Sequence, residues 1–235
     1  IMGKIHGGYL LRAIVTPLLT DDHPHPFSVS ATFVRSPDGG AATLELDTVR
    51  VGRRVSQHRV RLLQGGEICV DALVTTGKHH GEAAPFWESH AMPALPAVEG
   101  CVRSPAELAP GVRIGHLDFV DLRYASTNPF AGSPDASEGR IAAHGRMTDG
   151  DTAVVDLLVL GDAMPPVPLD MGLLGWVPTV ELTIHVRDLP APGWLTIEQR
   201  THLMQDGWID EECDIWDSRG RLVCQARQLA SYRLP

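Results

Sequence analysis

One pattern of secondary structure occurs twice in this chain, and this internal repeat constrains the fold more than any other feature. The first copy opens at Phe27 with "FSVSATFVRSPDGG", and the second opens at Thr179 with "TVELTIHVRDLPAPG". In each copy an alternating strand ends in Val-Arg. A Pro/Gly turn, a long strand and a hairpin that turns on glycine follow ("QGGEICV" and "SRGRLVC"). Apolar and polar residues that alternate between such turns predict antiparallel β-sheet.

A helical segment precedes each copy. "GGYLLRAIVTPLL" covers residues 7–19, and "DTAVVDLLVLGDAM" covers residues 151–164, with Asp149 or Asp151 as the N-cap and Pro165 as the stop. One apolar helix can cover the apolar face of each sheet. We therefore predict an α+β fold in which a helix followed by antiparallel strands occurs twice.

The chain has 235 residues, which is enough for two such units. Between them, "GEAAPFWESHAMPALPAVEG" is rich in Pro, Ala and Gly and predicts a linker. We place an N-terminal unit at residues 1–78, the linker at 79–110 and a C-terminal unit at 111–235. Strands of the C-terminal unit are also expected in "VRIGHLDFVDLRYA" and "GRIAAHGRM".

The composition of the chain argues against several kinds of binding partner. The net charge of −9 argues against nucleic acid and against an anionic membrane surface. The apolar runs are far shorter than the roughly 20 residues that cross a bilayer, so no membrane insertion is expected. The four cysteines form no C-x-x-C pair, which favours free thiols and a cytoplasmic location. The segments "HPHP" and "KHHGE" lack ligand spacing on a helix, and we expect no metal and no cofactor.

One carboxylate lies at the end of a nearly all-apolar run, "LLVLGDAMPPVP" at residues 157–168. On a helix, Asp162 would share its face with Val155, Leu158 and Val159. A buried carboxylate is costly unless it is hydrogen-bonded, and a negative charge at a helix C-terminus is disfavoured. Two interpretations stay open. Asp162 is a polar residue that faces solvent at the helix end, or it is held there for chemistry.

Gln228 is a second candidate. In "GRLVCQARQLASY", alternation places it on a small apolar face with Cys224 and Ala226. A shift of about 154 residues aligns this strand with the first copy, where Val74 stands in place of the glutamine. This asymmetry favours one working site, in the C-terminal unit. A core glutamine bonded to backbone is an equally open interpretation.

Several segments, taken in their order and spacing, resemble the acyl-CoA thioesterase II family. They are "HGGYLLRAI", "HPFSVSATFVRS", "LGDAMPP", "PTVELTIHVR" and "GRLVCQARQLA". The resemblance extends over nearly the whole chain. It implies a double hotdog, in which two antiparallel sheets each wrap a central helix. It also implies an enzyme that hydrolyses an acyl-CoA substrate to a free fatty acid and CoA.

By motif, the hydrolytic residues of that family fall on Asp162, Thr179 and Gln228. The resemblance implies that Asp162 is a general base, acting on a water that Thr179 and Gln228 hold in line for attack. Glu181 stands where family members often carry an aspartate, and we interpret it as a solvated strand residue. Strict alternation would turn Thr179 away from the helix. Thr179 therefore reaches Asp162 only if its strand starts irregularly after a proline, Pro178.

Gly7 and Gly8 stand at the start of the first helix and are candidate substrate-binding residues. Free N–H groups at a helix start could meet a ligand that approaches closely. Close packing of helix on sheet would require the same two glycines, and both interpretations stay open.

Rival functions find less support. No G-x-S-x-G nucleophile elbow is present, and a hotdog hydratase would need a histidine soon after the aspartate, where "AMPPVPLDMG" has none. A non-catalytic hotdog protein that binds acyl-CoA or an acyl carrier is the main alternative. The presence of all three site residues favours the thioester hydrolase. Exposed sheet edges predict a homodimer or a higher homo-oligomer.

Overall fold

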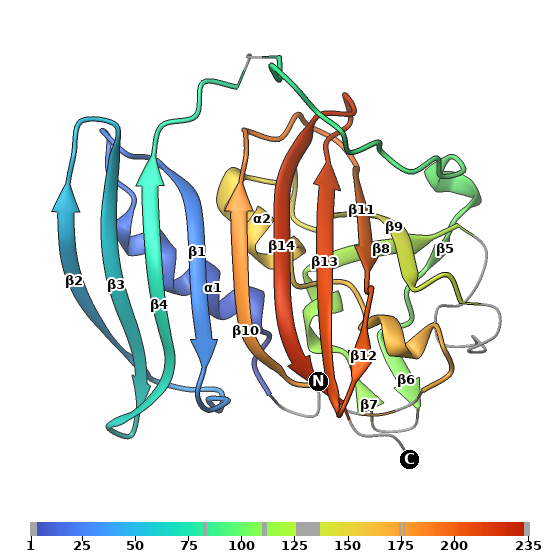
Figure 1. Cartoon of the computed structure of the whole chain (residues 1–235), viewed down its shortest axis with the longest axis horizontal. Helices are drawn as coiled ribbons and strands as arrows, with labels where there is room; N and C mark the ends of the chain where they lie inside the picture. The colour runs from blue at the N-terminus through green and yellow to red at the C-terminus, as the bar shows by residue number, and fades with distance from the viewer. Residues whose placement is uncertain are drawn as a thin grey trace.

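The fold consists mainly of one long antiparallel sheet with two helices on one of its faces. The computed structural model describes residues 4–81, 84–109, 112–125, 137–173, 175 and 177–232. The 12-stranded sheet has the order β2-β3-β4-β1-β10-β14-β13-β11-β9-β8-β5, and β12 pairs with β13 off this path. Helices α1 and α2 lie behind the sheet in Figure 1. This α+β architecture agrees with the predicted fold class.

The elements have the following bounds. The helices are α1 (Gly7–Val15) and α2 (Leu157–Leu160). The large sheet holds β1 (His25–Phe33), β2 (Thr43–Val51), β3 (Val55–Gln64), β4 (Glu67–Gly77), β5 (Val102–Arg103), β8 (Val120–Tyr124), β9 (Arg140–Met147), β10 (Thr179–Val186), β11 (Leu195–Arg200), β12 (Met204–Gln205), β13 (Trp208–Trp216) and β14 (Leu222–Ser231). A separate hairpin pairs β6 (Glu107–Ala109) with β7 (Val112–Arg113).

The strand register of the first half recurs in the second half, at an offset close to the one seen in the sequence. In the first half, Ala31 of β1 pairs with Ala72 of β4, and in the second half Ile184 of β10 pairs with Ala226 of β14. The register also shifts near the start of β1 and near the start of β10, at matching places. Strands β1 and β10 pair with each other, so the two halves share one continuous sheet.

The second helix is shorter than the predicted span of residues 151–164. A 3₁₀ turn over Val154–Asp156 precedes the four α-helical residues of α2. The Asp156 carboxylate accepts the Ala153 N–H at 3.0 Å, which closes this first turn tightly. At the other end, the Asp162 N–H donates to Val159 O, three residues back, so the chain leaves the α-helix before Asp162. The first helix continues after Val15 as a 3₁₀ turn to Leu18, close to the predicted end at residue 19.

The segment predicted as a linker contains structure of its own. Strand β5 pairs with β8 at one end of the large sheet, and β6 begins the small hairpin. The strand expected in residues 112–125 is divided into β7, a 3₁₀ turn and β8, whereas β9 lies where "GRIAAHGRM" predicts a strand. Residue 111, where we place the start of the C-terminal unit, lies outside the described residues. Linker residues 82, 83 and 110 do so as well.

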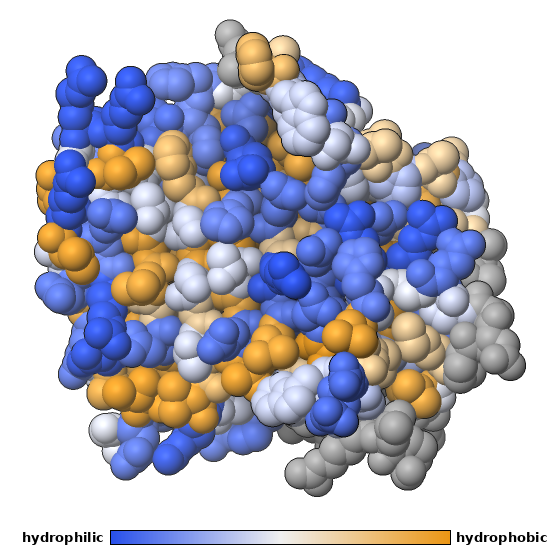
Figure 2. All heavy atoms as spheres, viewed as in Figure 1, coloured by the Kyte–Doolittle hydropathy of each residue, from blue (hydrophilic) through white to orange (hydrophobic). Residues whose placement is uncertain are grey.

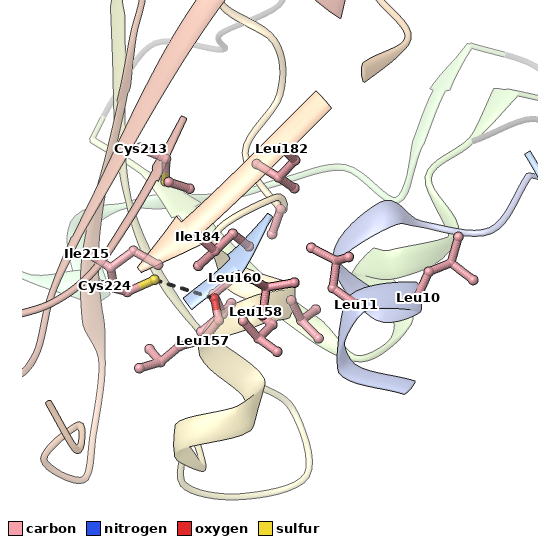
Figure 3. Close-up of a cluster of buried hydrophobic side chains, with 14 of the residues drawn as sticks. Leu10, Leu11, Leu157, Leu158, Leu160, Leu182, Ile184, Cys213, Ile215 and Cys224 are labelled. Carbon is pink, nitrogen blue, oxygen red and sulfur yellow. Dashed lines mark hydrogen bonds between the residues drawn. The ribbon is translucent and has the colours of Figure 1, made fainter. Parts of the chain in front are cut away.

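The core lies between the helices and the sheet. Leu11 of α1, Leu158 and Leu160 of α2, and Ile184 of β10 are fully buried there (Figure 3). The Cys224 thiol donates a weak hydrogen bond to Leu157 O at 3.8 Å in the same cluster. All four cysteines are free thiols. The opposite face of the sheet mixes hydrophilic and apolar side chains (Figure 2). None of the helices described here is both long and apolar enough to cross a bilayer.

Helix α1 approaches α2 at a glycine. A Cβ added at Gly8 would lie 2.5 Å from Leu158 O and 2.9 Å from Val159 Cα, both backbone atoms of α2. Because backbone atoms in a packed core cannot move aside cheaply, a side chain here forces the two helices apart. Gly8 is therefore required by the spacing of the helices.

We predict that Gly8→Ala destabilises the protein by about 1–3 kcal/mol, because the overpacking outweighs the better helix propensity of alanine. Urea denaturation of both proteins measures the difference. Gly39→Ala is the matched control, because a Cβ at Gly39 meets nothing within 4 Å, and we expect it to stay within about 0.5 kcal/mol of wild type. A Gly8→Ala variant as stable as wild type would contradict this account of the helix contact.

Candidate functional site

Asp162 is largely buried at the contact between the two helices. Its side chain is 13% exposed, and its Oδ2 accepts the Gly8 N–H of α1 at 2.7 Å. The carboxylate thus lies at the N-terminal end of α1, a helix from the other half of the chain. The dipole of that helix favours a negative charge at this end. The interpretation of Asp162 as a residue that faces solvent is therefore wrong.

Gly7 and Gly8 give the carboxylate room. A Cβ at Gly7 would lie 2.8 Å from Asp162 Oδ2 and 3.1 Å from Phe33 Cζ. The Gly8 N–H is already engaged by Asp162, so close packing accounts for Gly8. The binding of substrate at these glycines stays a prediction.

Two histidines that the sequence analysis did not select surround Asp162. His6 caps α1, where its Nδ1 accepts the Tyr9 N–H at 3.2 Å. In the neutral ring Nε2 then carries the proton, and it lies 2.8 Å from Asp162 O and 3.3 Å from Asp162 Oδ2. The His116 ring packs on His6 with the centroids 4.4 Å apart, and its Nε2 lies 3.1 Å from Ala163 O.

Burial keeps both rings neutral at pH 7. Desolvation lowers the pKa of His6 to about 4. Desolvation, followed by the neighbouring His6, lowers the pKa of His116 to about 3. The two rings therefore hold backbone carbonyls next to Asp162 and bring no positive charge to it. His6 precedes the glycine pair in "HGG" and could have been suspected from the sequence, whereas nothing in "IGHLD" marks His116.

The same burial acts in the opposite direction on the carboxylate. Desolvation raises the pKa of Asp162 from 3.8 to about 6, against the hydrogen bond from the Gly8 N–H, which lowers it. At pH 7 Asp162 is mostly ionised, yet it is far more basic than an exposed aspartate. Such a group is suited to accept a proton near neutral pH.

Thr179 and Gln228 contact each other on the sheet. The Thr179 Oγ1 donates to Gln228 Oε1 at 2.7 Å. Thr179 pairs with Ala230 while Glu181 pairs with Leu229, so one extra residue, Val180, lies in a β-bulge between them. This bulge confirms the predicted irregular strand start and turns Thr179 toward the face that carries Gln228. Glu181 is exposed, in agreement with its interpretation as a solvated residue.

Glu211 of β13 is a third member of this group, and the sequence analysis missed it. Gln228 Nε2 donates to Glu211 Oε2 at 2.5 Å, and the Val167 N–H donates to Glu211 Oε1 at 2.6 Å. The residue is 1% exposed, and burial raises the pKa of its carboxyl. It stands in the acidic run "DEECD", which hides it. Its alternation with the apolar residues Ile209 and Cys213 could have revealed it.

The site therefore has a helix side and a sheet side. Asp162 stands on the helix side, and the hydrogen-bonded chain of Thr179, Gln228 and Glu211 stands on the sheet side. Among the described residues no hydrogen bond joins Asp162 to Thr179 or Gln228, although its charge influences the carboxyl of Glu211. The described part of the chain holds no group of three or more His, Cys, Asp or Glu residues that could bind a metal ion.

Known proteins resemble this chain in sequence and in fold. An uncharacterized protein of Mycobacterium tuberculosis is 30% identical, over 97% of this chain and 85% of its own length. A candidate thioesterase II from Thermobifida fusca YX is 31% identical, with a TM-score of 0.84, over 97% of this chain and 86% of that one. A protein with a hotdog fold from Alicyclobacillus acidocaldarius is 17% identical, with a TM-score of 0.85, over 100% of this chain and 89% of that one.

The family profiles cover both halves of the sheet. The profile of the acyl-CoA thioesterase N-terminal domain matches residues 1–77, and the profile of the acyl-CoA thioesterase C-terminal domain matches residues 94–232. Together they include all the predicted site residues, from Gly7 to Gln228. The chain belongs to the acyl-CoA thioesterase family.

Proposed function

We propose that this protein hydrolyses acyl-CoA thioesters with a water that Asp162 activates, and that its two halves form a double hotdog. The observation that carries the proposal is a largely buried carboxylate with a pKa near 6, which one backbone N–H holds and whose charge acts on Glu211, the partner of the Thr179–Gln228 pair. Family membership supports the substrate class. We also propose that Gly7 and Gly8 border the substrate.

The reaction requires no protein nucleophile. A thioester carbonyl is electrophilic, and the thiolate leaves readily. Asp162 takes a proton from water as the water oxygen bonds to the carbonyl carbon, and a tetrahedral intermediate forms. Its collapse breaks the C–S bond. The proton on Asp162 then passes to the departing thiolate, so that the products are a carboxylic acid and CoA.

Thr179 and Gln228 orient the water in this scheme. The Thr179 hydroxyl donates its single proton in the hydrogen bond to Gln228 Oε1, so its oxygen is free to accept a hydrogen bond from the water. Two acceptors, Thr179 and Asp162, then fix both protons of the water and leave a lone pair free for attack. The non-catalytic alternative, a protein that only binds acyl-CoA or an acyl carrier, gives no reason for this arrangement.

We also propose an oligomeric state and a cellular location for this protein. Strand β2 forms one edge of the sheet, where Leu46, Val49 and Val51 are exposed. Such an edge favours pairing with a second copy, and we propose a homo-oligomer. The free thiols fit a reducing compartment, and we propose a cytoplasmic location.

Wild type should release CoA thiol from at least one acyl-CoA in a panel of short to long chains. Asp162→Asn should lower kcat by about 10²–10⁴-fold, because it removes the base and keeps the side-chain shape. A thiol-trapping assay measures both proteins. Turnover by both at equal rates would sink the role of Asp162, and acyl-CoA binding without turnover by wild type would favour the non-catalytic alternative.

The pH dependence should report the same carboxyl. We expect kcat/KM to fall tenfold per pH unit below about pH 6 and to be level above it, because protonated Asp162 cannot accept a proton. Initial rates between pH 4.5 and 8.5 give the profile. A rate that stays level down to pH 4.5 would exclude Asp162 as the base.

The free energy of unfolding should depend on the protonation of this carboxyl. Asp162 titrates near pH 6 when folded and near 3.8 when unfolded, so the folded state binds more protons between these values. The free energy of unfolding contributed by this group therefore falls as pH rises from about 4 to about 6. Asp162→Asn removes that fall. Its stability relative to wild type should increase across this window by on the order of 2–3 kcal/mol.

Urea denaturation of wild type and Asp162→Asn at pH 4 and at pH 7.5 measures this change. Comparison of the two proteins at each pH cancels the other titrating groups. The same difference in stability at both pH values would mean that Asp162 has an ordinary pKa in the folded protein.

A further inference from the structure

Glu211 is a buried carboxylate with hydrogen-bond donors on several sides. It lies on the inner face of β13, directly across from Gln228 in the pairing of β13 with β14. One oxygen accepts the Val167 N–H at 2.6 Å, and the other accepts Gln228 Nε2 at 2.5 Å. The Gln199 side chain also donates to this carboxylate. A carboxylate can only accept, so these partners satisfy it without water.

A glutamine amide can be placed in two ways that differ by a half-turn. One way presents Oε1 to Thr179, and the other presents Nε2. Glu211 decides between them, because a carboxylate can meet the NH₂ end of Gln228 and would repel its oxygen. We propose that Glu211 is a positioning residue, which orients the amide of Gln228 so that Thr179 donates to it.

The orientation of Gln228 sets the direction of the next hydrogen bond. With Oε1 toward Thr179, the hydroxyl donates at 2.7 Å and its oxygen accepts from the attacking water. With Nε2 toward Thr179, the hydroxyl would accept from the amide and donate to the water. The water would then lose one of the two acceptors that direct its lone pair. This inference rests on the proposed function, since it assigns Glu211 to that reaction.

The internal repeat offers a comparison within the chain. In the first half, His58 pairs with Val74 just as Glu211 pairs with Gln228 in the second half. Where the amide is replaced by valine, the carboxylate is replaced as well. This agrees with a carboxylate whose purpose is to orient an amide, and not to support the sheet.

The direct test is Glu211→Gln. A glutamine at 211 has one acceptor, which the Val167 N–H takes, and its NH₂ end then faces Gln228. We expect Gln228 to turn over, and kcat to fall about 10–100-fold with KM within about twofold of wild type. Glu212→Gln is the matched control. Glu212 lies one residue further along β13, pairs with Arg200 at 3.1 Å, and should keep wild-type kcat.

An exchange of the two residues separates orientation from a general loss of structure. In Glu211→Gln/Gln228→Glu, the new glutamine donates to the new carboxylate, and Thr179 again donates to residue 228. The net charge is unchanged. We expect kcat to recover at least about tenfold over Glu211→Gln. A Glu211→Gln variant that is folded and as active as wild type would overturn the inference, and so would an exchange variant that shows no recovery.

A measurement that does not depend on catalysis tests the orientation of Gln228 independently of the proposed function. The side-chain NH₂ of Gln228 can be followed by ¹H–¹⁵N NMR and assigned with Gln228→Glu. In wild type we expect one downfield proton that exchanges slowly with solvent, and in Glu211→Gln we expect this signal to be lost. Identical Gln228 signals in both proteins would overturn the inference. Absence of hydrolysis by wild type, with these signals as expected, would overturn only the proposed function.

Discussion

The hydrogen bond from the Gly8 N–H to the Asp162 carboxylate joins the two halves of the chain at the place where the site is built. It depends on backbone contact between α1 and α2, and therefore on glycine at position 8. It gives a buried negative charge one firm donor at a helix N-terminus. The packing around this contact also removes water from the carboxylate, and this burial raises the pKa of Asp162 although the hydrogen bond lowers it.

The sheet side of the site depends on a different device. The bulge at Val180 turns Thr179 toward the inner face, where Gln228 and Glu211 continue the hydrogen-bonded chain. A corresponding shift of register lies near the start of β1, so the bulge belongs to the repeated architecture. The second half differs from the first in its polar side chains, above all at Gln228, where the first half has Val74. The two halves therefore share one architecture, and we propose a single working site in the second half.

The sequence predicted what depends on local pattern. Alternation and turn residues located the strands, and the proline before Thr179 pointed to the irregular start that the bulge provides. The sequence could not set the length of α2, because 3₁₀ and α turns share one apolar pattern. It also missed Glu211 and His116. Each acquires its partners only through tertiary contacts, Glu211 within an acidic run and His116 in a turn with no distinctive neighbours.

We propose that Asp162 is a largely buried base, with a pKa near neutral pH, held at the contact between the helices. The most direct measurement is the titration of its side-chain carboxyl carbon by NMR in the free protein, with Asp162→Asn to assign the signal. We expect a midpoint near pH 6. A midpoint near 3.8, the value for an aspartate in water, would show that the carboxylate is well solvated and would contradict the account.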